Sequence, residues 1–411
     1  MVHEHPAPRL VLIESNTTGS GRDFCARARD RGLEPLLVTR DPGRYPYAAQ
    51  DGVPVLVADT GDTGTVLRLC RELDAPVAGV TSSSEYFAAT AAEAARSLGL
   101  PAPDAGAVSR CRDKALQRRA LADAGVPVPS FHEVRTVSEG VALARGSDRP
   151  VVVKPVLGSG SDGVRLCRTP EETAEALAAL LRAPSEGPGR ALVEGYMDGP
   201  EFSVETFDDR VVGVTAKHLG EPPRFLETGH EHPAPLPADR ERALGETALA
   251  ALAALGLGWG PAHVELRLTT DGPRIVEVNP RLGGGMIPAL VEAATGVDLV
   301  SATVARVLGE RPDLAPVRSR GAALRHLFTP RSGTVVLAAP DGAERAPGVV
   351  RAAVTVREGR RLEVTHTFRD RIGHVIATAG DTARAAERAE HALGLLGVLI
   401  ASDGEITVPA D

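Results

Sequence analysis

Aromatic side chains and clustered basic residues are both scarce in this chain. Phe, Trp and Tyr make up 3% of the 411 residues, and the formal net charge is −8. The chain contains no basic run interleaved with aromatic residues. A nucleic-acid-binding protein needs a basic surface that meets the phosphates. The composition therefore argues against nucleic acid as a partner.

Paired cysteines and long apolar runs are also missing. The four cysteines, Cys25, Cys70, Cys111 and Cys167, form no CxxC pair, which argues against a disulfide framework or a zinc site. The amino terminus lacks a basic segment followed by a long apolar core. The longest apolar-rich stretch, Ala248–Leu257, is too short to cross a bilayer. We therefore expect a cytoplasmic protein without a membrane partner.

The first 105 residues, by contrast, show a clear alternation of strands and helices. Apolar strands are expected at 9–14, 36–39, 55–58 and 77–81, with helices between them. This alternation is typical of a parallel α/β sheet. Glu85 directly follows the fourth strand, where open α/β sheets bind ligands. It could hold a substrate amine, or it could only stabilise the start of a helix.

The stretch HVELRLTTDGPRIVEVNPRLGGG (263–285) predicts two strands joined by a tight turn at the DGP triplet. Polar and apolar residues alternate on both sides of this turn. After the turn, we expect Ile275, Glu277 and Asn279 to share one face. Folding the strands about the turn brings Glu265 roughly opposite Glu277.

Two neighbouring carboxylates repel each other, so this hairpin is costly without a cation. Glu265, Glu277 and the carbonyl of Asn279 are oxygen ligands that suit Mg²⁺, which takes further ligands from phosphates. Arg281 follows on the same side, where it could neutralise a phosphoryl oxygen or a carboxylate. The alternative is a solvated hairpin face, since most strand glutamates are only that.

A glycine-rich loop, GSGSDG (158–163), lies between two predicted strands, VVVKPV and VRLC. Its pattern is formally GxGxxG, but a dinucleotide-binding turn must open a helix, and a strand follows here. Between antiparallel strands, such a loop forms a flap whose backbone N–H groups can cover phosphates. Lys154 lies on the strand that enters the flap and could meet a phosphate. A plain glycine hairpin with a surface lysine is the alternative.

Two further segments carry candidate nucleotide contacts. A helix is expected over 108–125, on which Lys114 could reach a phosphate or be solvated. The segment 191–207 predicts a strand, a short connection and a second strand. The backbone from Glu194 to Met197 could pair with adenine, and Glu201 could bind ribose hydroxyls.

The segment PPRFLETGHEHPAPLP (222–237) is rich in proline and lacks periodicity, so it predicts a loop. His230 and His232 resemble a metal-binding pair, but no third ligand lies at a useful spacing. We favour a loop that lines the substrate pocket, with His230 or Arg224 as contacts. The last ninety residues predict several strands and a helix, interpreted as an α+β lobe that closes over the site.

The order of VVVKP with its flap, LVEGYMDGPEFSVE and VELRL…RIVEVNPRLGGG resembles the ATP-grasp superfamily of carboxylate–amine ligases, over about residues 9–310. ETGHEHPAPL and NPRLGGGMIPALVEAATG look most like the L-amino acid ligase group. The resemblance implies an α/β and α+β fold with a parallel-sheet preATP-grasp domain at 1–107. A small ATP-grasp lobe with the flap would follow at 108–205. A C-terminal lobe with antiparallel sheets, the magnesium site and the closing α+β subregion would occupy 206–411.

The resemblance also implies a role for each candidate residue. The implied ATP contacts are Lys114, Lys154, Gly158, Ser159, Gly160, Ser161, Gly163, Glu194, Tyr196, Met197 and Glu201. Glu265, Glu277 and Asn279 would hold two Mg²⁺ ions, which Mn²⁺ could replace. The implied substrate contacts are Glu85, His230, Arg281 and Gly284. Arg281 would also stabilise the acyl phosphate and the tetrahedral intermediate.

The implied reaction joins an amino acid or small carboxylate to an amine, through an acyl phosphate, with release of ADP and phosphate. Relatives suggest a homodimer. Another branch of the superfamily, such as a purine-pathway ligase or carboxylase, is one alternative. A non-catalytic nucleotide-binding sensor is another, although the presence of Glu265, Glu277, Asn279 and Arg281 argues against it.

Overall fold

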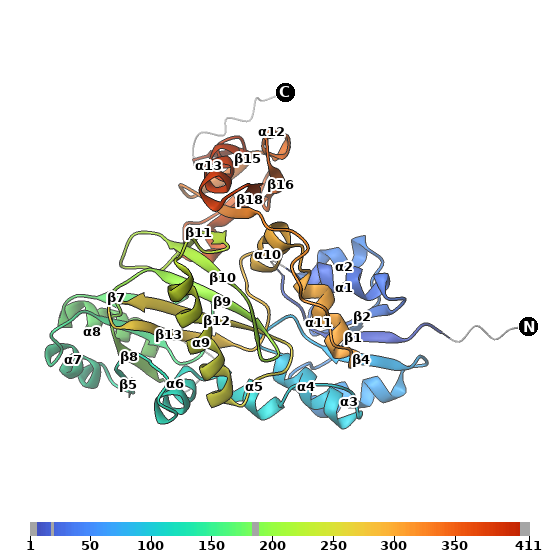
Figure 1. The fold of residues 1–411 in the computed structure, drawn as a ribbon, viewed down its shortest axis with the longest axis horizontal. Helices are drawn as coiled ribbons and strands as arrows, with labels where there is room; N and C mark the ends of the chain where they lie inside the picture. The colour runs from blue at the N-terminus through green and yellow to red at the C-terminus, as the bar shows by residue number, and fades with distance from the viewer. Residues whose placement is uncertain (1–5, 18–19, 183–188, 403–411) are drawn as a thin grey trace, which may run out of the picture.

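The computed structural model describes residues 6–17, 20–182 and 189–402. The amino-terminal part contains the parallel sheet that the sequence predicts, with strand order β3-β2-β1-β4 (right in Figure 1). Its strands are β1 (Arg9–Ile13), β2 (Glu34–Thr39), β3 (Val55–Val57) and β4 (Val77–Thr81). The helices of this part are α1 (Gly21–Asp30), α2 (Pro46–Gln50), α3 (Thr63–Glu72) and α4 (Ala88–Ser97), with a 3-10 turn, η1 (Pro42–Arg44).

Alternate side chains along β1 pack into two different hydrophobic cores. Val11 and Ile13 pack with residues of α3 and α4, whereas Leu10 and Leu12 pack toward α1. That second core also includes Val304 of α11 (Leu299–Val307), a helix far along the chain. The amino-terminal sheet therefore shares a core with the carboxyl-terminal half of the chain.

A second, antiparallel sheet carries the flap. Its strand order is β5-β8-β6-β7 (left in Figure 1). The strands are β5 (Phe131–Val134), β6 (Val151–Pro155), β7 (Arg165–Cys167) and β8 (Ala191–Gly195). The helices α7 (Val137–Arg145) and α8 (Pro170–Arg182) pack on this sheet. β6 and β7 are antiparallel neighbours, as the flap interpretation requires.

The largest sheet has the order β13-β12-β9-β10-β11-β14-β18-β16. Its strands are β9 (Glu201–Phe207), β10 (Arg210–Leu219), β11 (Glu227–His232), β12 (Pro261–Thr269), β13 (Gly272–Asn279), β14 (Gly321–Phe328), β16 (Val349–Val354) and β18 (Arg371–Ala379). The long helix α9 (Ala238–Leu255) packs on it. The carboxyl-terminal strands β14, β16 and β18 thus continue the sheet that contains the glutamate hairpin.

The remaining carboxyl-terminal elements complete the top of the molecule in Figure 1. β17 (Arg361–Leu362), β15 (Gly333–Ala339) and β19 (Gly397–Ala401) form a small sheet. Besides α9 and α11, the helices of this half are α10 (Ile287–Thr295), α12 (Asp341–Glu344) and α13 (Thr382–Leu393), with a 3-10 turn, η2 (Phe368–Asp370).

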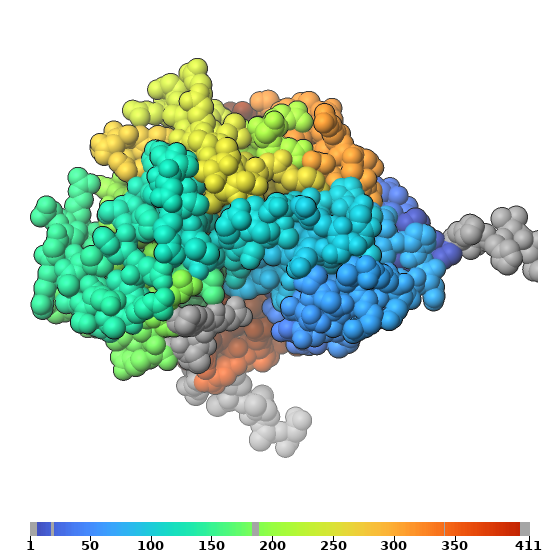
Figure 2. All heavy atoms as spheres, turned by 90° about the horizontal axis from the view of Figure 1, so that it is seen from below, coloured from blue at the N-terminus to red at the C-terminus, as the bar shows by residue number. Residues whose placement is uncertain are grey.

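The expectation of one helix over 108–125 is wrong, because the chain breaks at Asp113. Asp113 is extended, with φ −92° and ψ 104°, and separates α5 (Ala105–Arg112) from α6 (Lys114–Asp123). Its side chain accepts hydrogen bonds from the first turn of α6, which makes it an N-cap. In Figure 2, the cyan surface near residue 100 lies between the blue amino-terminal residues and the teal residues that follow.

The expectation of a loop over 222–237 is wrong for 227–232. These residues form β11, which pairs with β10 on one side and β14 on the other. The polar sequence ETGHEH carries no strand signal of its own. It is extended because two neighbouring strands satisfy its backbone groups.

No single described helix is long and apolar enough to span a membrane. α10 and α11 together meet the length and composition criteria, but they are bent by 107° relative to each other. Most of their apolar side chains are buried in the protein core.

The shared core predicts that α11 stabilises the amino-terminal sheet. Val304→Ala should lower the free energy of unfolding by roughly 1–3 kcal/mol, because Val304 is fully buried and its removal leaves a cavity. Val317→Ala is the matched control, since Val317 is 77% exposed and should change stability little. Urea unfolding of both variants measures the difference. Equal stability of the two would contradict this account of the core.

Candidate active site

The central hairpin brings two carboxylates together across neighbouring strands. In the register of β12 and β13, Glu265 lies directly opposite Glu277, as the turn position predicts. The expectation that Ile275 shares a face with Glu277 and Asn279 is wrong, however. A bulge next to Glu265 shifts the register, so Ile275 is fully buried while Val276 lines a cavity beside Glu277.

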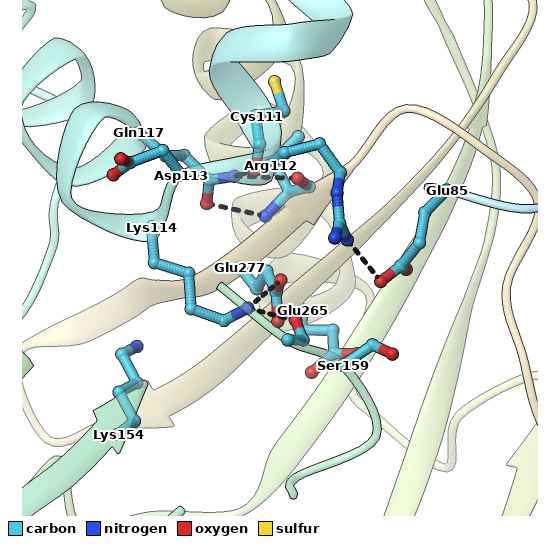
Figure 3. Close-up of polar contacts among 12 residues, drawn as sticks. Glu85, Cys111, Arg112, Asp113, Lys114, Gln117, Lys154, Ser159, Glu265 and Glu277 are labelled. Atoms are coloured by element: carbon cyan, nitrogen blue, oxygen red, sulfur yellow. Dashed lines mark hydrogen bonds and ion pairs between the residues drawn. The ribbon is translucent and has the colours of Figure 1, made fainter. Parts of the chain in front are cut away.

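Each of these carboxylates is paired with a buried lysine. The Nζ atom of Lys114 lies 3.0 Å from Glu277, and that of Lys217 lies 3.0 Å from Glu265. Figure 3 shows Lys114 directed at the carboxylate of Glu277. Lys114 also donates a 2.7 Å hydrogen bond to the carbonyl of Gly158 in the flap. Lys114 is buried, so the alternative of a solvated surface lysine does not describe it.

No sequence motif identified Lys217, but its ammonium group binds three glutamates. Its Nζ lies 2.9 Å from Glu201, 2.9 Å from Glu227 and 3.0 Å from Glu265. Burial opposes the charge, but the three carboxylates outweigh burial and raise the pKa of Lys217 well above its ordinary value. Burial would likewise raise the pKa of Glu265, and Lys217 together with His263 lowers it instead. Both groups are therefore charged at neutral pH.

His263 lies between two carboxylates and was also missed. Its Nδ1 is 2.8 Å from Glu205 and its Nε2 is 3.1 Å from Glu265. Burial favours the neutral ring, but Glu205 and Glu265 outweigh burial and raise the pKa of His263 to about 9. The imidazolium therefore neutralises part of the acidic cluster at neutral pH.

A cavity of about 110 Å³ collects most of the predicted nucleotide contacts. The predicted residues that line it are Lys114, Lys154, Gly158, Ser159, Gly160, Ser161, Glu194, Tyr196, Met197, Glu201, Glu265 and Glu277. Gly163 belongs to the flap but not to this lining. The cavity joins the flap sheet to the glutamate hairpin, as a site for a phosphate chain and its counter-ions requires.

Within this cavity, Glu194 fixes two cations with its side chain. Its carboxylate is 2.8 Å from Lys154 Nζ and 2.7 Å from Arg118 Nε. Burial and Arg118 lower the pKa of Lys154 to about 8, against the opposing effect of Glu194. The neighbouring Tyr196 N–H donates to Pro150 O, so this amide is already used inside the sheet.

Glu201 is also engaged by cations. Besides Lys217, it accepts a 3.1 Å hydrogen bond from Arg267. The guanidinium of Arg267 lies 5.2 Å from the ring centroids of both Tyr196 and Phe225, whose rings are stacked. Arg267 and Phe225 were missed, although Arg267 lies on the same predicted strand as Glu265. Tyr196, Phe225 and Arg267 thus form an aromatic wall of the nucleotide cavity, which Met197 also lines.

The flap contacts both halves of the molecule. Ser159 Oγ lies 3.2 Å from Tyr86 Oη in the amino-terminal part. On the other side, Arg369 donates to Asp162 at 3.2 Å. Gly160, with φ 65°, packs so closely against Phe368 that a Cβ atom would lie 2.7 Å from that ring. Only glycine fits at this close approach.

Arg281 and Glu85 form an ion pair outside the lining of the nucleotide cavity. Glu85 accepts a 2.7 Å hydrogen bond from Arg281 Nε and a 2.7 Å hydrogen bond from Arg112 Nη1. Figure 3 shows Arg112 reaching Glu85 beside the hairpin. A small cavity lies between Glu85 and the glutamate hairpin, because Glu85, Glu277 and Asn279 all line it. α4 begins only at Ala88, so Glu85 orders two arginines here and does not stabilise a helix start.

His230 and Gly284 do not line the nucleotide cavity. His230 is fully buried on β11, and burial lowers its pKa to about 3. His232 points elsewhere, with Nδ1 3.0 Å from Thr215. Arg224 is exposed. The described residues contain no group of three or more His, Cys, Asp or Glu able to hold a metal ion, so a His230–His232 metal site has no support there.

The position of His263 predicts a pH dependence of stability. Because its folded pKa of about 9 exceeds the ordinary value near 6.5, its contribution is full below pH 6.5 and is lost as the pH rises to 9. The loss amounts to roughly 3 kcal/mol. In His263→Gln, the free energy of unfolding should fall less steeply between pH 6.5 and 9. His132→Gln is the control, since His132 is exposed. Parallel curves for His263→Gln and wild type would rule out the ion pairs.

Comparison with known proteins identifies two domains in the chain. The model of the ATP-grasp domain matches residues 147–289, and that of L-amino acid ligase C-terminal domain 2 matches residues 325–401. The uncharacterized protein y4rH of Sinorhizobium fredii is 38% identical over 379 residues, which cover 90% of this chain and 78% of that protein. Carnosine synthase 1 of Gallus gallus is 33% identical over 252 residues, which cover 56% of this chain but only 26% of the relative.

Solved structures share the fold. The L-amino acid ligase from Bacillus licheniformis superposes with a TM-score of 0.82 at 24% identity and covers 96% of this chain and 99% of its own. The phosphoribosylglycinamide synthetase from Anaerococcus prevotii gives a TM-score of 0.75 at 17% identity, with 96% and 100% covered. The resemblance inferred from the motifs is thus confirmed. The chain belongs to the ATP-grasp superfamily of ADP-forming carboxylate–amine ligases, and it carries the C-terminal domain of the L-amino acid ligases.

Proposed function

We propose that this chain joins an amino acid or small carboxylate to an amine, in the simplest case a second amino acid, through an acyl phosphate. ADP and phosphate are the other products. One observation carries the proposal: the paired carboxylates Glu265 and Glu277 share a cavity with Lys114, Lys154 and the flap. A sensor would need a nucleotide pocket but not a second carboxylate beside the phosphates.

The lining of the cavity supports a nucleotide with its phosphates under the flap. Lys114 and Lys154 would neutralise phosphate oxygens, and the flap N–H groups at 158–163 would cover them. Tyr196 and Met197 would meet the adenine next to the aromatic wall, and Glu201 the ribose. Glu194 would act through Lys154, because its carboxylate is occupied by that lysine and by Arg118.

The residues present also fit magnesium. Glu265 is held in its ionised form, and together with Glu277 and Asn279 it offers oxygen ligands that Mg²⁺ favours. With two carboxylates and one amide from the protein, phosphate oxygens and water would complete the coordination of one or two ions. When bound, Mg²⁺ would supply charge neutralisation at the transferred phosphoryl group. Lys114 and Lys217 hold the same carboxylates in this structure.

Arg281 would stabilise charge on the reacting acyl group. A carboxylate is a poor electrophile, and phosphorylation makes it reactive toward an amine. The tetrahedral intermediate then carries negative charge that a fixed guanidinium can stabilise. Glu85 would orient Arg281, and its carboxylate could in addition hold the incoming ammonium group. The flap, anchored by Tyr86 and Phe368, would keep water away from the acyl phosphate.

The first test measures phosphate release with ATP, Mg²⁺ and all pairs of amino acids, with ADP and AMP resolved. We expect ADP and phosphate only with certain pairs, together with the matching amide by mass spectrometry. Formate and bicarbonate are tested with each amine as the alternative carboxyl donors. AMP with pyrophosphate would contradict the acyl-phosphate route, and turnover only with bicarbonate or formate would place the enzyme in another branch.

The paired carboxylates give a direct mutational test. Glu277→Ala should lower kcat by roughly a hundredfold or more, because the phosphoryl transfer loses a ligand of its counter-ion. The thermal unfolding of the variant should stay cooperative. Glu246→Ala is the matched control, since Glu246 is an exposed glutamate on α9. A fully active Glu277→Ala enzyme would exclude the metal assignment.

A further inference from the structure

A group of polar atoms around Gly285 lacks partners. Among the described residues, no hydrogen-bond partner is found for either ring nitrogen of His230, for Nε2 of His326 or for Nε of Arg371. These side chains come from the adjacent strands β11, β14 and β18. An unpaired buried polar group costs roughly 1–3 kcal/mol, so such a cluster calls for an explanation.

The three side chains that carry these atoms converge on one point. A Cβ atom placed on Gly285 would lie 3.4 Å from His230 Cε1, 3.6 Å from Arg371 Nη1 and 3.7 Å from His326 Nε2. Gly285 ends the GGG loop that follows Arg281. The nitrogen atoms are buried in this structure, but Gly285 is partly exposed and has no side chain to separate them from a group that enters beside it.

Arg371 is the one cation of the cluster, and it is paired with the carboxylate of Glu227, which also lies 3.9 Å from His230 Nε2. Burial keeps both rings neutral, lowering the pKa of His230 to about 3 and that of His326 to about 2. A neutral imidazole still offers one N–H donor. Arg371 supplies a fixed positive charge. Its Nη2 is held by the backbone carbonyl of Glu227 at 2.9 Å and by the carboxylate at 3.0 Å, which leaves Nε and Nη1 free to bind.

The helix that follows the GGG loop adds a further attraction for an anion. The nine-residue helix α10 begins at Ile287, two residues after Gly285, and its N-cap, Met286, makes no side-chain cap. The dipole of the helix favours an anion at its amino-terminal end, although Ile287 N–H is bonded to Gly284 O and Pro288 has no N–H. The unpartnered nitrogen atoms, the guanidinium and the helix end therefore all favour a carboxylate, whose two oxygens fit the fork of an arginine.

The cluster is next to the proposed reaction site. Glu227 lines the nucleotide cavity and also holds Arg371. Arg281 stands at one end of the GGG loop, tied to Glu85, and Arg371 faces the other end. When one amino acid acts as the amine, it brings a carboxylate that must not be phosphorylated. A separate cation, away from Glu265 and Glu277, is suited to hold it.

We propose that Arg371, assisted by His230 and His326, binds the unreacting carboxylate of the amino acid that supplies the amine. This inference rests on the proposed function. It also gives the carboxyl-terminal strands a task in substrate binding, because β14 and β18 supply His326 and Arg371. Arg371 is a substrate-binding residue in this account, and the step of bond formation stays with the residues near Arg281.

Calorimetry tests the site without turnover. Each amino acid is titrated into the full-length protein with Mg²⁺ and a non-hydrolysable ATP analogue. An amino acid that binds the wild type should bind Arg371→Gln roughly tenfold more weakly or worse. Its carboxamide should bind both proteins equally. Arg360→Gln is the matched control, since Arg360 is exposed in the same half of the chain. Equal affinity of the amino acid for Arg371→Gln and wild type would overturn the proposal.

Steady-state kinetics distinguishes the carboxylate of the amine substrate from that of the carboxyl donor. With an active pair, Arg371→Gln should raise KM for the amine substrate and leave KM for the carboxyl donor unchanged; the reverse pattern would overturn the proposal. Arg371→Lys keeps the charge without the fork, serves if Arg371→Gln fails to fold, and should show a smaller loss of the same kind. The protein could also bind an amino acid in an Arg371-dependent way and yet show no ligase turnover. That result would contradict the proposed function but support the carboxylate site.

Discussion

The buried ion pairs of Lys217 are the interaction on which the site depends. One ammonium group meets the carboxylates of Glu201, Glu227 and Glu265 within 3.0 Å. Each of these glutamates also binds a second cation, respectively Arg267, Arg371 and His263. Buried charges are tolerable only when they are paired, so removal of any one member would leave another uncompensated. The nucleotide cavity, the hairpin and the carboxyl-terminal strands are thereby linked electrostatically.

This arrangement explains how the chain can hold several carboxylates where a phosphate chain must bind. Without lysine and histidine partners, the acidic cluster would repel ATP. With them, Glu265 stays ionised and its charge is balanced until ligands arrive. Lys114 illustrates the same principle from another element, since it joins Glu277 to the flap carbonyl of Gly158. Lys114 therefore links the flap directly to the carboxylate of the hairpin.

The carboxyl-terminal residues are part of the same structure and not an added lobe around it. β14 pairs with β11, so the largest sheet runs without a break from the glutamate hairpin to β16. Phe368 and Arg369 reach the flap from this half, and Arg371 reaches Glu227. The amino-terminal sheet, in turn, shares its core with α11.

Local signals in the sequence determined the parallel sheet, the flap between antiparallel strands and the pairing of Glu265 with Glu277. Alternation, turn residues and glycine loops depend on near neighbours, so they can be read along the chain. The bulge at Val276 and the strand β11 were decided by tertiary structure, whereas the helix break at Asp113 follows from a local N-cap. Ile275 and Val276 are both apolar and suit either face, and ETGHEH becomes a strand only between two partners. The same holds for Lys217, whose charge is stable only because distant strands bring three glutamates to it.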